Sequence, residues 1–163
     1  MRELLGSVYR DHRQGLFSLA LSITGDANRA EDAIHDAFER LFRRLGKPAG
    51  DPIAYVFAAV RNASLDQLRR RPRATAPDSI FEFLPAANQP SPDRAASDSE
   101  RDRLVRAALD GLPEAQREAV VMRLYSGLSF EQMAEATREP MSTVASRYRR
   151  ALESLRASVE TLV

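Results

Sequence analysis

Apolar residues recur every three or four positions in three segments of the N-terminal half, and no stretch alternates as a β-strand would. The segments predict helices at about 1–24, 26–45 and 51–71. Residues with known positional preferences mark their ends. Gly25 follows the first segment, Asp26 is a suitable N-cap for the second, and Asp51-Pro52 supplies an N-cap and first-turn proline for the third. The pattern predicts an all-α domain over residues 1–72.

The helical spacing then stops over residues 73–97. Five of the nine prolines fall in or beside this stretch, at Pro72, Pro77, Pro85, Pro90 and Pro92. We expect a flexible linker here. One apolar group, residues 80–84, is unusual for a linker, and it either docks on a partner or packs back onto one of the helical domains.

Helical spacing resumes over residues 98–163, with helices expected at about 98–112, 114–125, 129–137 and 143–158. Gly127 ends the second of these. Ser129 and Gln132 have the spacing of a capping box, and Ser142 is the expected N-cap of the last helix. A short helix, a tight turn and a longer helix form the helix-turn-helix arrangement of DNA-binding proteins.

The last helix has two faces. An apolar stripe is expected to be buried and contains Val144, Tyr148, Ala151, Leu152 and Leu155. A second stripe contains Thr143, Ser146, Arg147 and Arg150, whose hydroxyls and guanidinium groups suit contacts to bases and phosphates. The alternative is an ordinary amphipathic helix with a solvated basic face.

Composition restricts the function further. The chain has no cysteine, no apolar run long enough to cross a bilayer, and no signal-peptide core near its start, so we expect a cytoplasmic protein. The net charge of +1 is unevenly spread, because residues 1–73 hold 13 basic and 9 acidic side chains while residues 74–99 hold 1 and 4. No nucleotide-binding loop, serine or cysteine nucleophile motif or zinc-protease motif is present, so no catalytic residue is assigned.

Both halves resemble one family. The matching runs in the C-terminal half are LPEAQREAVV (112–121), GLSFEQMA (127–134) and STVASR (142–147), and those in the N-terminal half are LFSLA (16–20), DANRAEDAIHDAF (26–38), AYVFAAVRN (54–62) and LDQLRRR (65–71). Together they resemble the extracytoplasmic-function sigma factors. The resemblance implies two small helical domains joined by a flexible linker, the second with a helix-turn-helix. It also implies a non-enzymatic subunit that lends promoter recognition to RNA polymerase.

The resemblance implies three sets of binding residues. For the −35 element they are Ser142, Thr143, Ser146, Arg147 and Arg150. For the −10 element they are Tyr55, Arg61, Asn62, Asp66, Arg69 and Arg70, with the loop at 46–52 beside them. For core polymerase they are Asp32, His35, Asp36 and Glu39. The expected partners are core RNA polymerase, promoter DNA and an anti-sigma factor, with no cofactor, metal or membrane insertion.

Two positions depart from the family pattern. The turn reads Arg138-Glu139-Pro140 where many members have a glycine, and Ala145 stands where a basic residue is common. Weaker or altered −35 recognition is therefore expected. A stand-alone helix-turn-helix regulator is the main alternative. A helical adaptor with solvated arginines, an enzyme, and a metal site around Glu31 and residues 32–36 are less favoured.

Overall fold

The computed structural model describes residues 1–44, 46–72 and 95–161, and the regular secondary structure in this part of the chain is all helical. The elements are α1 (Arg2–Thr24), α2 (Ala27–Arg43), α3 (Pro52–Arg70), α4 (Ala95–Asp110), α5 (Glu114–Val120), η3 (Val121–Tyr125), α6 (Phe130–Thr137) and α7 (Met141–Thr161). Helix α4 therefore starts within the last three residues assigned to the linker. The apolar group at 80–84 lies outside the described residues.

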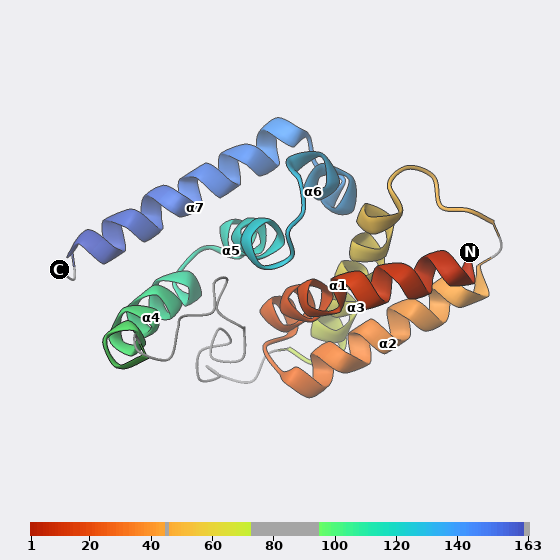
Figure 1. Ribbon diagram of the computed structural model, residues 1–163, viewed down its shortest axis with the longest axis horizontal. Helices are drawn as coiled ribbons and strands as arrows, with labels where there is room; N and C mark the ends of the chain where they lie inside the picture. The colour runs from red at the N-terminus through yellow and green to blue at the C-terminus, as the bar shows by residue number, and fades with distance from the viewer. Residues whose placement is uncertain (45, 73–94, 162–163) are drawn as a thin grey trace.

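Helices α1, α2 and α3 pack on one another as a three-helix bundle (Figure 1). The predicted helix ends are confirmed: Gly25 is left-handed with φ of 74°, the Asp26 carboxylate accepts from the backbone N–H of Arg29, and the Asp51 carboxylate accepts from that of Ile53. Arg29 also donates through Nη2 to the carbonyls of Gln67, at 2.7 Å, and Arg71. The Arg71 carbonyl lies beyond the last turn of α3, where carbonyls lack helical partners, whereas the Gln67 carbonyl also accepts from the backbone N–H of Arg71.

The second domain contains the helix-turn-helix. Where one helix over 114–125 was expected, α5 runs into a π-helical turn, η3, before Gly127 turns the chain with φ of 71°. The capping box at the start of α6 is confirmed, since the Ser129 hydroxyl and the Gln132 side chain each bond to the other's backbone N–H. The helices α6 and α7 then pack against each other.

Two expectations about α7 were wrong. Ser142 is not its N-cap, because the helix already starts at Met141, and the carbonyl of Pro140 accepts from the N–H groups of Thr143 and Val144. Leu152 is not buried but 40% exposed. The side chain of Leu152 points about 100° away from that of the fully buried Ala151, which takes it off the packed stripe.

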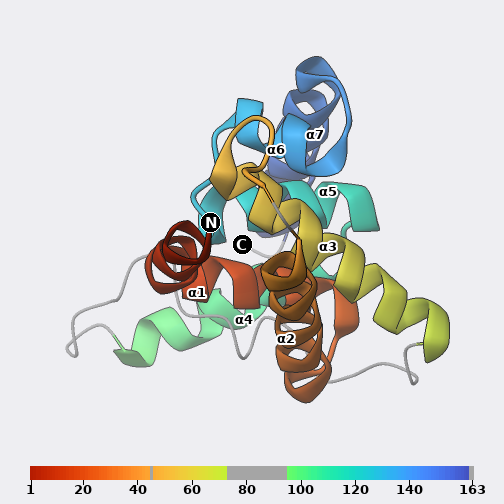
Figure 2. The same ribbon diagram turned by 90° about the vertical axis from the view of Figure 1, so that its right-hand side faces the viewer.

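The two domains lie directly against each other. Figures 1 and 2 show α6 beside α3, and α5 and η3 contact α1. The buried apolar side chains of both domains form one continuous cluster. Polar contacts reinforce this interface, among them a buried hydrogen bond of 2.9 Å from the Ser126 hydroxyl to the carbonyl of Gly15.

Candidate nucleic-acid interface

Aromatic and cationic contacts hold the start of α6 against α7 and η3. The ring of Phe130 on α6 meets the ring of Tyr148 on α7 edge-on at a centroid distance of 5.6 Å. The guanidinium of Arg123 lies 4.9 Å from the Phe130 ring centroid and donates to the carbonyl of Leu128. Phe130 thus joins α6 to η3 on one side and to α7 on the other.

The turn between these helices forms without glycine. Arg138 adopts the left-handed conformation, with φ of 56° and ψ of 35°, and ends α6. It is the one non-glycine residue with positive φ among those the structure describes. Arg138 thus takes the left-handed conformation that a glycine commonly adopts at the end of a helix. Its side chain makes this conformation more strained than it would be for glycine.

The predicted −35 residues lie on α7 with different exposure. Ser142 and Arg150 are exposed, whereas Thr143, Ser146 and Arg147 are half-buried. Arg147 lies nearest the packed side and forms an ion pair with Glu139 in the turn, at 3.6 Å between Nη2 and Oε1. These five residues therefore share one side of the helix but differ in exposure.

Arg149 is exposed on α7 and was missed in the sequence analysis. It lies seven residues after Ser142 and three after Ser146, a spacing that places all three on one side of the helix. The assumption that Leu152 is buried shifted the expected packed stripe toward Arg149. Without that assumption the helical periodicity would have placed Arg149 on the solvent face.

Four of the predicted −10 residues line one face of α3. Tyr55, Asn62, Asp66 and Arg69 are spaced by seven, four and three positions, and Arg70 is exposed beside them. The hydroxyl of Tyr55, a half-buried residue, accepts from Arg44 at 2.9 Å. The carboxylate of Asp66 pairs with Arg40 and Arg69 at 3.4 and 3.3 Å, which leaves Asn62 as an exposed polar side chain on this face.

Arg61 departs from this face. It points toward the second domain and pairs with Glu118 of α5, and the two side chains are only 24% and 19% exposed. The structure therefore does not bring Arg61 together with Tyr55 and Asn62. Phe57, by contrast, is fully buried, and its ring centroid lies 6.0 Å from that of His12.

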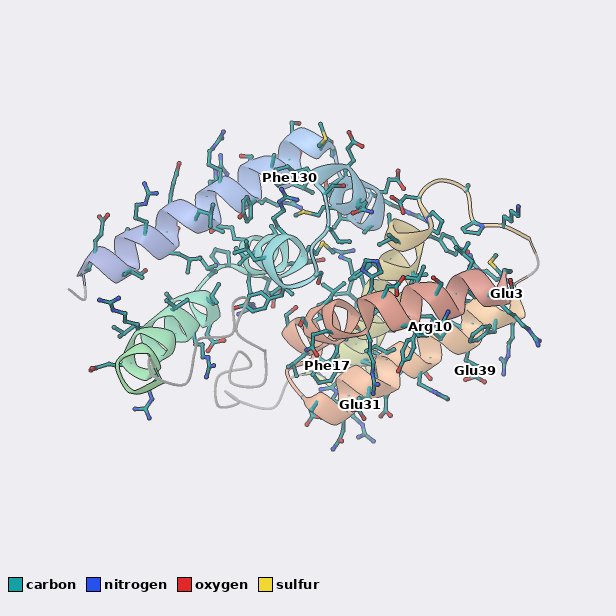
Figure 3. The ribbon with its side chains drawn as sticks, viewed as in Figure 1. Glu3, Arg10, Phe17, Glu31, Glu39 and Phe130 are labelled. Atoms are coloured by element: carbon teal, nitrogen blue, oxygen red, sulfur yellow. The ribbon has the colours of Figure 1, made fainter. Side chains whose placement is uncertain are left out.

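The predicted polymerase-binding residues follow one face of α2. Asp32, His35 and Glu39 are exposed there, and Asp36 is half-buried. The structure adds a groove of about 1030 Å³ between α1 and α2, with aromatic side chains that the sequence analysis did not assign to a site. Tyr9, Phe17, Phe38 and Phe42 line this groove, and Figure 3 labels Phe17 with Arg10 and Glu31 along it.

Two further observations concern the described residues only. No group of three or more histidine, aspartate or glutamate side chains among them is arranged to hold a metal ion. None of the helices they form has both the length and the apolar character to cross a bilayer.

Comparison with known proteins decides the family. Residues 8–74 match the model for Sigma-70 region 2, and residues 102–155 match that for Sigma-70, region 4. The chain is 30% identical to the ECF RNA polymerase sigma factor EcfG of Rhodopseudomonas palustris, over 87% of this chain and 77% of the relative. This chain belongs to the extracytoplasmic-function family of RNA polymerase sigma factors. It directs promoter-specific initiation of transcription, and a match in both domains disfavours a stand-alone regulator.

Other relatives agree with this assignment. This sigma factor is 32% identical to the ECF RNA polymerase sigma factor SigE of Mycolicibacterium smegmatis, and it spans only 58% of the length of that relative. It is 28% identical to the RNA polymerase sigma-H factor of Pseudomonas aeruginosa and spans 84% of its length. A solved complex of the sigma factor RpoE with the anti-sigma factor NepR from Bartonella quintana has the same fold. The TM-score is 0.69 at 23% identity, over 98% of this chain and 95% of that one.

Proposed function

We propose that residues 1–72 bind core polymerase and the −10 element, and that residues 98–163 bind the −35 element, with residues 73–97 as the connection. The region 2 and region 4 matches support this division. The protein acts in the cytoplasm as a transcription initiation factor without catalytic residues or cofactor, and its partners are core polymerase, promoter DNA and an anti-sigma factor. The similarity to a sigma factor bound to NepR supports the last of these.

The proposed −35 function rests on the polar residues that share the solvent side of α7, the second helix of the helix-turn-helix. Ser142, Arg149 and Arg150 are exposed there, and Ser146 is half-buried beside them. The start of such a helix enters the major groove. There an arginine is able to bond a guanine with two hydrogen bonds or to neutralise a phosphate, while Thr143 and Arg147 contribute from the edges of this face.

The exposed face of α3 is the proposed −10 site. Opening a promoter requires an unstacked base to be held outside the duplex, at a cost that pocket contacts offset. Tyr55 offers a ring at one end of this face, Asn62 offers an amide in the middle, and Asp66 orients Arg69. Arg69 and Arg70 then hold backbone phosphates, and the loop at 46–52 completes the pocket.

The acidic face of α2 is the proposed contact with core polymerase. Asp32, His35, Asp36 and Glu39 lie one and two turns apart along the helix, beside the aromatic groove between α1 and α2. Exposed aromatic side chains are the residue types that most often anchor protein interfaces. An acidic, partly aromatic surface is complementary to a basic helical surface on the polymerase.

Reconstitution tests the proposed function. We expect the purified chain to co-elute with core polymerase from a sizing column and to direct run-off transcription from a subset of genomic upstream fragments. Tight binding to duplex DNA without polymerase, and no co-elution, would instead indicate a stand-alone regulator. A helical adaptor with solvated arginines would co-elute with core polymerase without directing transcription.

Ala145 provides a graded test of the −35 assignment. Ala145→Lys is expected to tighten promoter binding by the reconstituted holoenzyme and to steepen its salt dependence by about one counterion, because the new ammonium neutralises one phosphate. Ala157→Lys, at an exposed position twelve residues further along α7, is the matched control. An equal change in slope for both variants would show that the effect is not specific to position 145.

A further inference from the structure

We propose that Arg29, at the start of α2, is a positioning residue for promoter binding. It clamps the end of α3 and so holds Arg69 and Arg70 where they reach backbone phosphates. The inference rests on the proposed −10 function of α3. Three features carry it: the contacts of Arg29, the sparse support of the end of α3, and the place of Arg29 in its own helix.

The Arg29 guanidinium bridges the end of α3. Its Nη2 donates to the carbonyl of Gln67 at 2.7 Å and also to the carbonyl of Arg71, the residue that follows the helix. One nitrogen therefore ties the chain that leaves the helix to the last helical turn, although Arg29 lies 38 and 42 positions earlier in the sequence. A cation is also favoured here, because the carbonyl end of a helix carries a partial negative charge.

Little else supports this end of α3. Ser64 is the last buried residue of the helix, and residues 69–72 are all exposed. The helix ends without a left-handed glycine, since Arg71 is extended with φ of −137° and ψ of 100°. The ion pairs of Asp66 lie at the surface, where such pairs contribute little. Among the described residues, the clamp from α2 is therefore the tertiary contact that restrains the chain where it leaves the helix.

Arginine is not a residue that α2 by itself favours at position 29. Arg29 is the third residue of the helix, where the partial positive charge of the free N–H groups opposes a cation. Its Nε–H is buried and meets no acceptor among the described residues, which also opposes stability. What the side chain gains is its bonding to α3. Arg29 therefore serves the end of α3 rather than its own helix.

An ordered helix end matters for the arginines on it. Arg69 and Arg70 occupy the last turn of α3 and are proposed to hold phosphates. Side chains on a frayed turn have more conformational freedom to lose when they meet DNA, and this loss weakens binding. Because the clamp restrains the backbone of the last turn, it keeps the two guanidinium groups in one arrangement before DNA arrives. Arg29 thus acts through these arginines without touching DNA itself.

Amide hydrogen exchange in the free chain tests the clamp. Arg29→Met keeps most of the stem of the side chain but removes its donors. We expect faster exchange at residues 68–71 in this variant and unchanged exchange in the middle of α3. Arg2→Met is the matched control, because Arg2 is also an arginine in the first turn of a helix but is exposed. Unchanged exchange at residues 68–71 in Arg29→Met would overturn the proposal.

Promoter binding by the reconstituted holoenzyme tests the functional step. Arg29→Met should weaken binding by roughly 2- to 30-fold, the range expected for the loss of one helix-end contact, and should lower the salt dependence by about one counterion. Arg29→Lys retains donors for the two carbonyls and should fall between the parent and Arg29→Met in both measurements. Arg2→Met should bind as the parent does. Thermal unfolding followed by circular dichroism checks that each variant is folded, and co-elution with core polymerase should be unchanged.

A double variant, Arg69→Ala with Arg70→Ala, distinguishes positioning from direct contact. If Arg29 acts through these two arginines, adding Arg29→Met to the double variant should weaken promoter binding no further. A full additional loss would mean that Arg29 contacts DNA itself, and the positioning role would be wrong.

The same double variant separates this proposal from the proposed function. If it loses promoter binding while Arg29→Met retains it, α3 acts as proposed and only the positioning role is wrong. If the double variant binds promoters as well as the parent does, the proposed function of this end of α3 fails, and the positioning role fails with it.

Discussion

Replacing Phe57 with alanine is expected to lower the free energy of unfolding by about 3–5 kcal/mol. Phe57 has no solvent exposure, packs in the centre of the bundle of α1, α2 and α3, and meets the ring of His12 edge-on. Its removal loses the transfer energy of the ring and leaves a cavity that three connected helices cannot fully close. This is a large share of the roughly 5–15 kcal/mol that stabilises a typical protein.

Urea unfolding followed by circular dichroism measures this effect. Phe42→Ala is the matched control, because Phe42 is also an aromatic residue in the first domain but is 44% exposed. The control should change the unfolding free energy by at most about 0.5 kcal/mol, as is usual for surface positions. Equal losses for the two variants would mean that Phe57 is not the centre of this core.

The second large effect is expected on promoter recognition. Arg149→Ala and Arg150→Ala should each weaken transcription from a −35-dependent promoter by roughly 5- to 150-fold, the equivalent of about 1–3 kcal/mol for one well-placed arginine–base contact. Both arginines are exposed on the first half of α7. Run-off transcription with reconstituted holoenzyme measures the loss, and co-elution with core polymerase should be unchanged.

Arg156→Ala is the control for this pair. Arg156 is an exposed arginine on the same helix, but it lies six residues beyond Arg150, about 9 Å further from the end proposed to enter the groove. It should retain most of the activity. If only Arg150 matters, the original assignment stands and the addition of Arg149 is wrong; if neither matters, α7 does not read the −35 element as proposed.

Local chemistry made much of the fold predictable. Gly25, Asp26, Asp51 and the pair Ser129 and Gln132 mark helix ends in the structure as they do in the sequence, because each satisfies backbone groups within a few residues of itself. Helical periodicity likewise predicted the helices α1, α2 and α3. The family could be inferred from the same sequence, because the matching runs occur in order in both halves.

Tertiary packing decided what local spacing left open. Leu152 shows this on α7, where the packed stripe is narrow and a shift of one position separates exposed from buried, so that Arg149 lies on the solvent-facing side. The partners of Arg61 and Gly15 are 57 and 111 positions away in the chain. No helical period relates residues so distant, and only the close approach of two folded domains brings Glu118 and Ser126 against them.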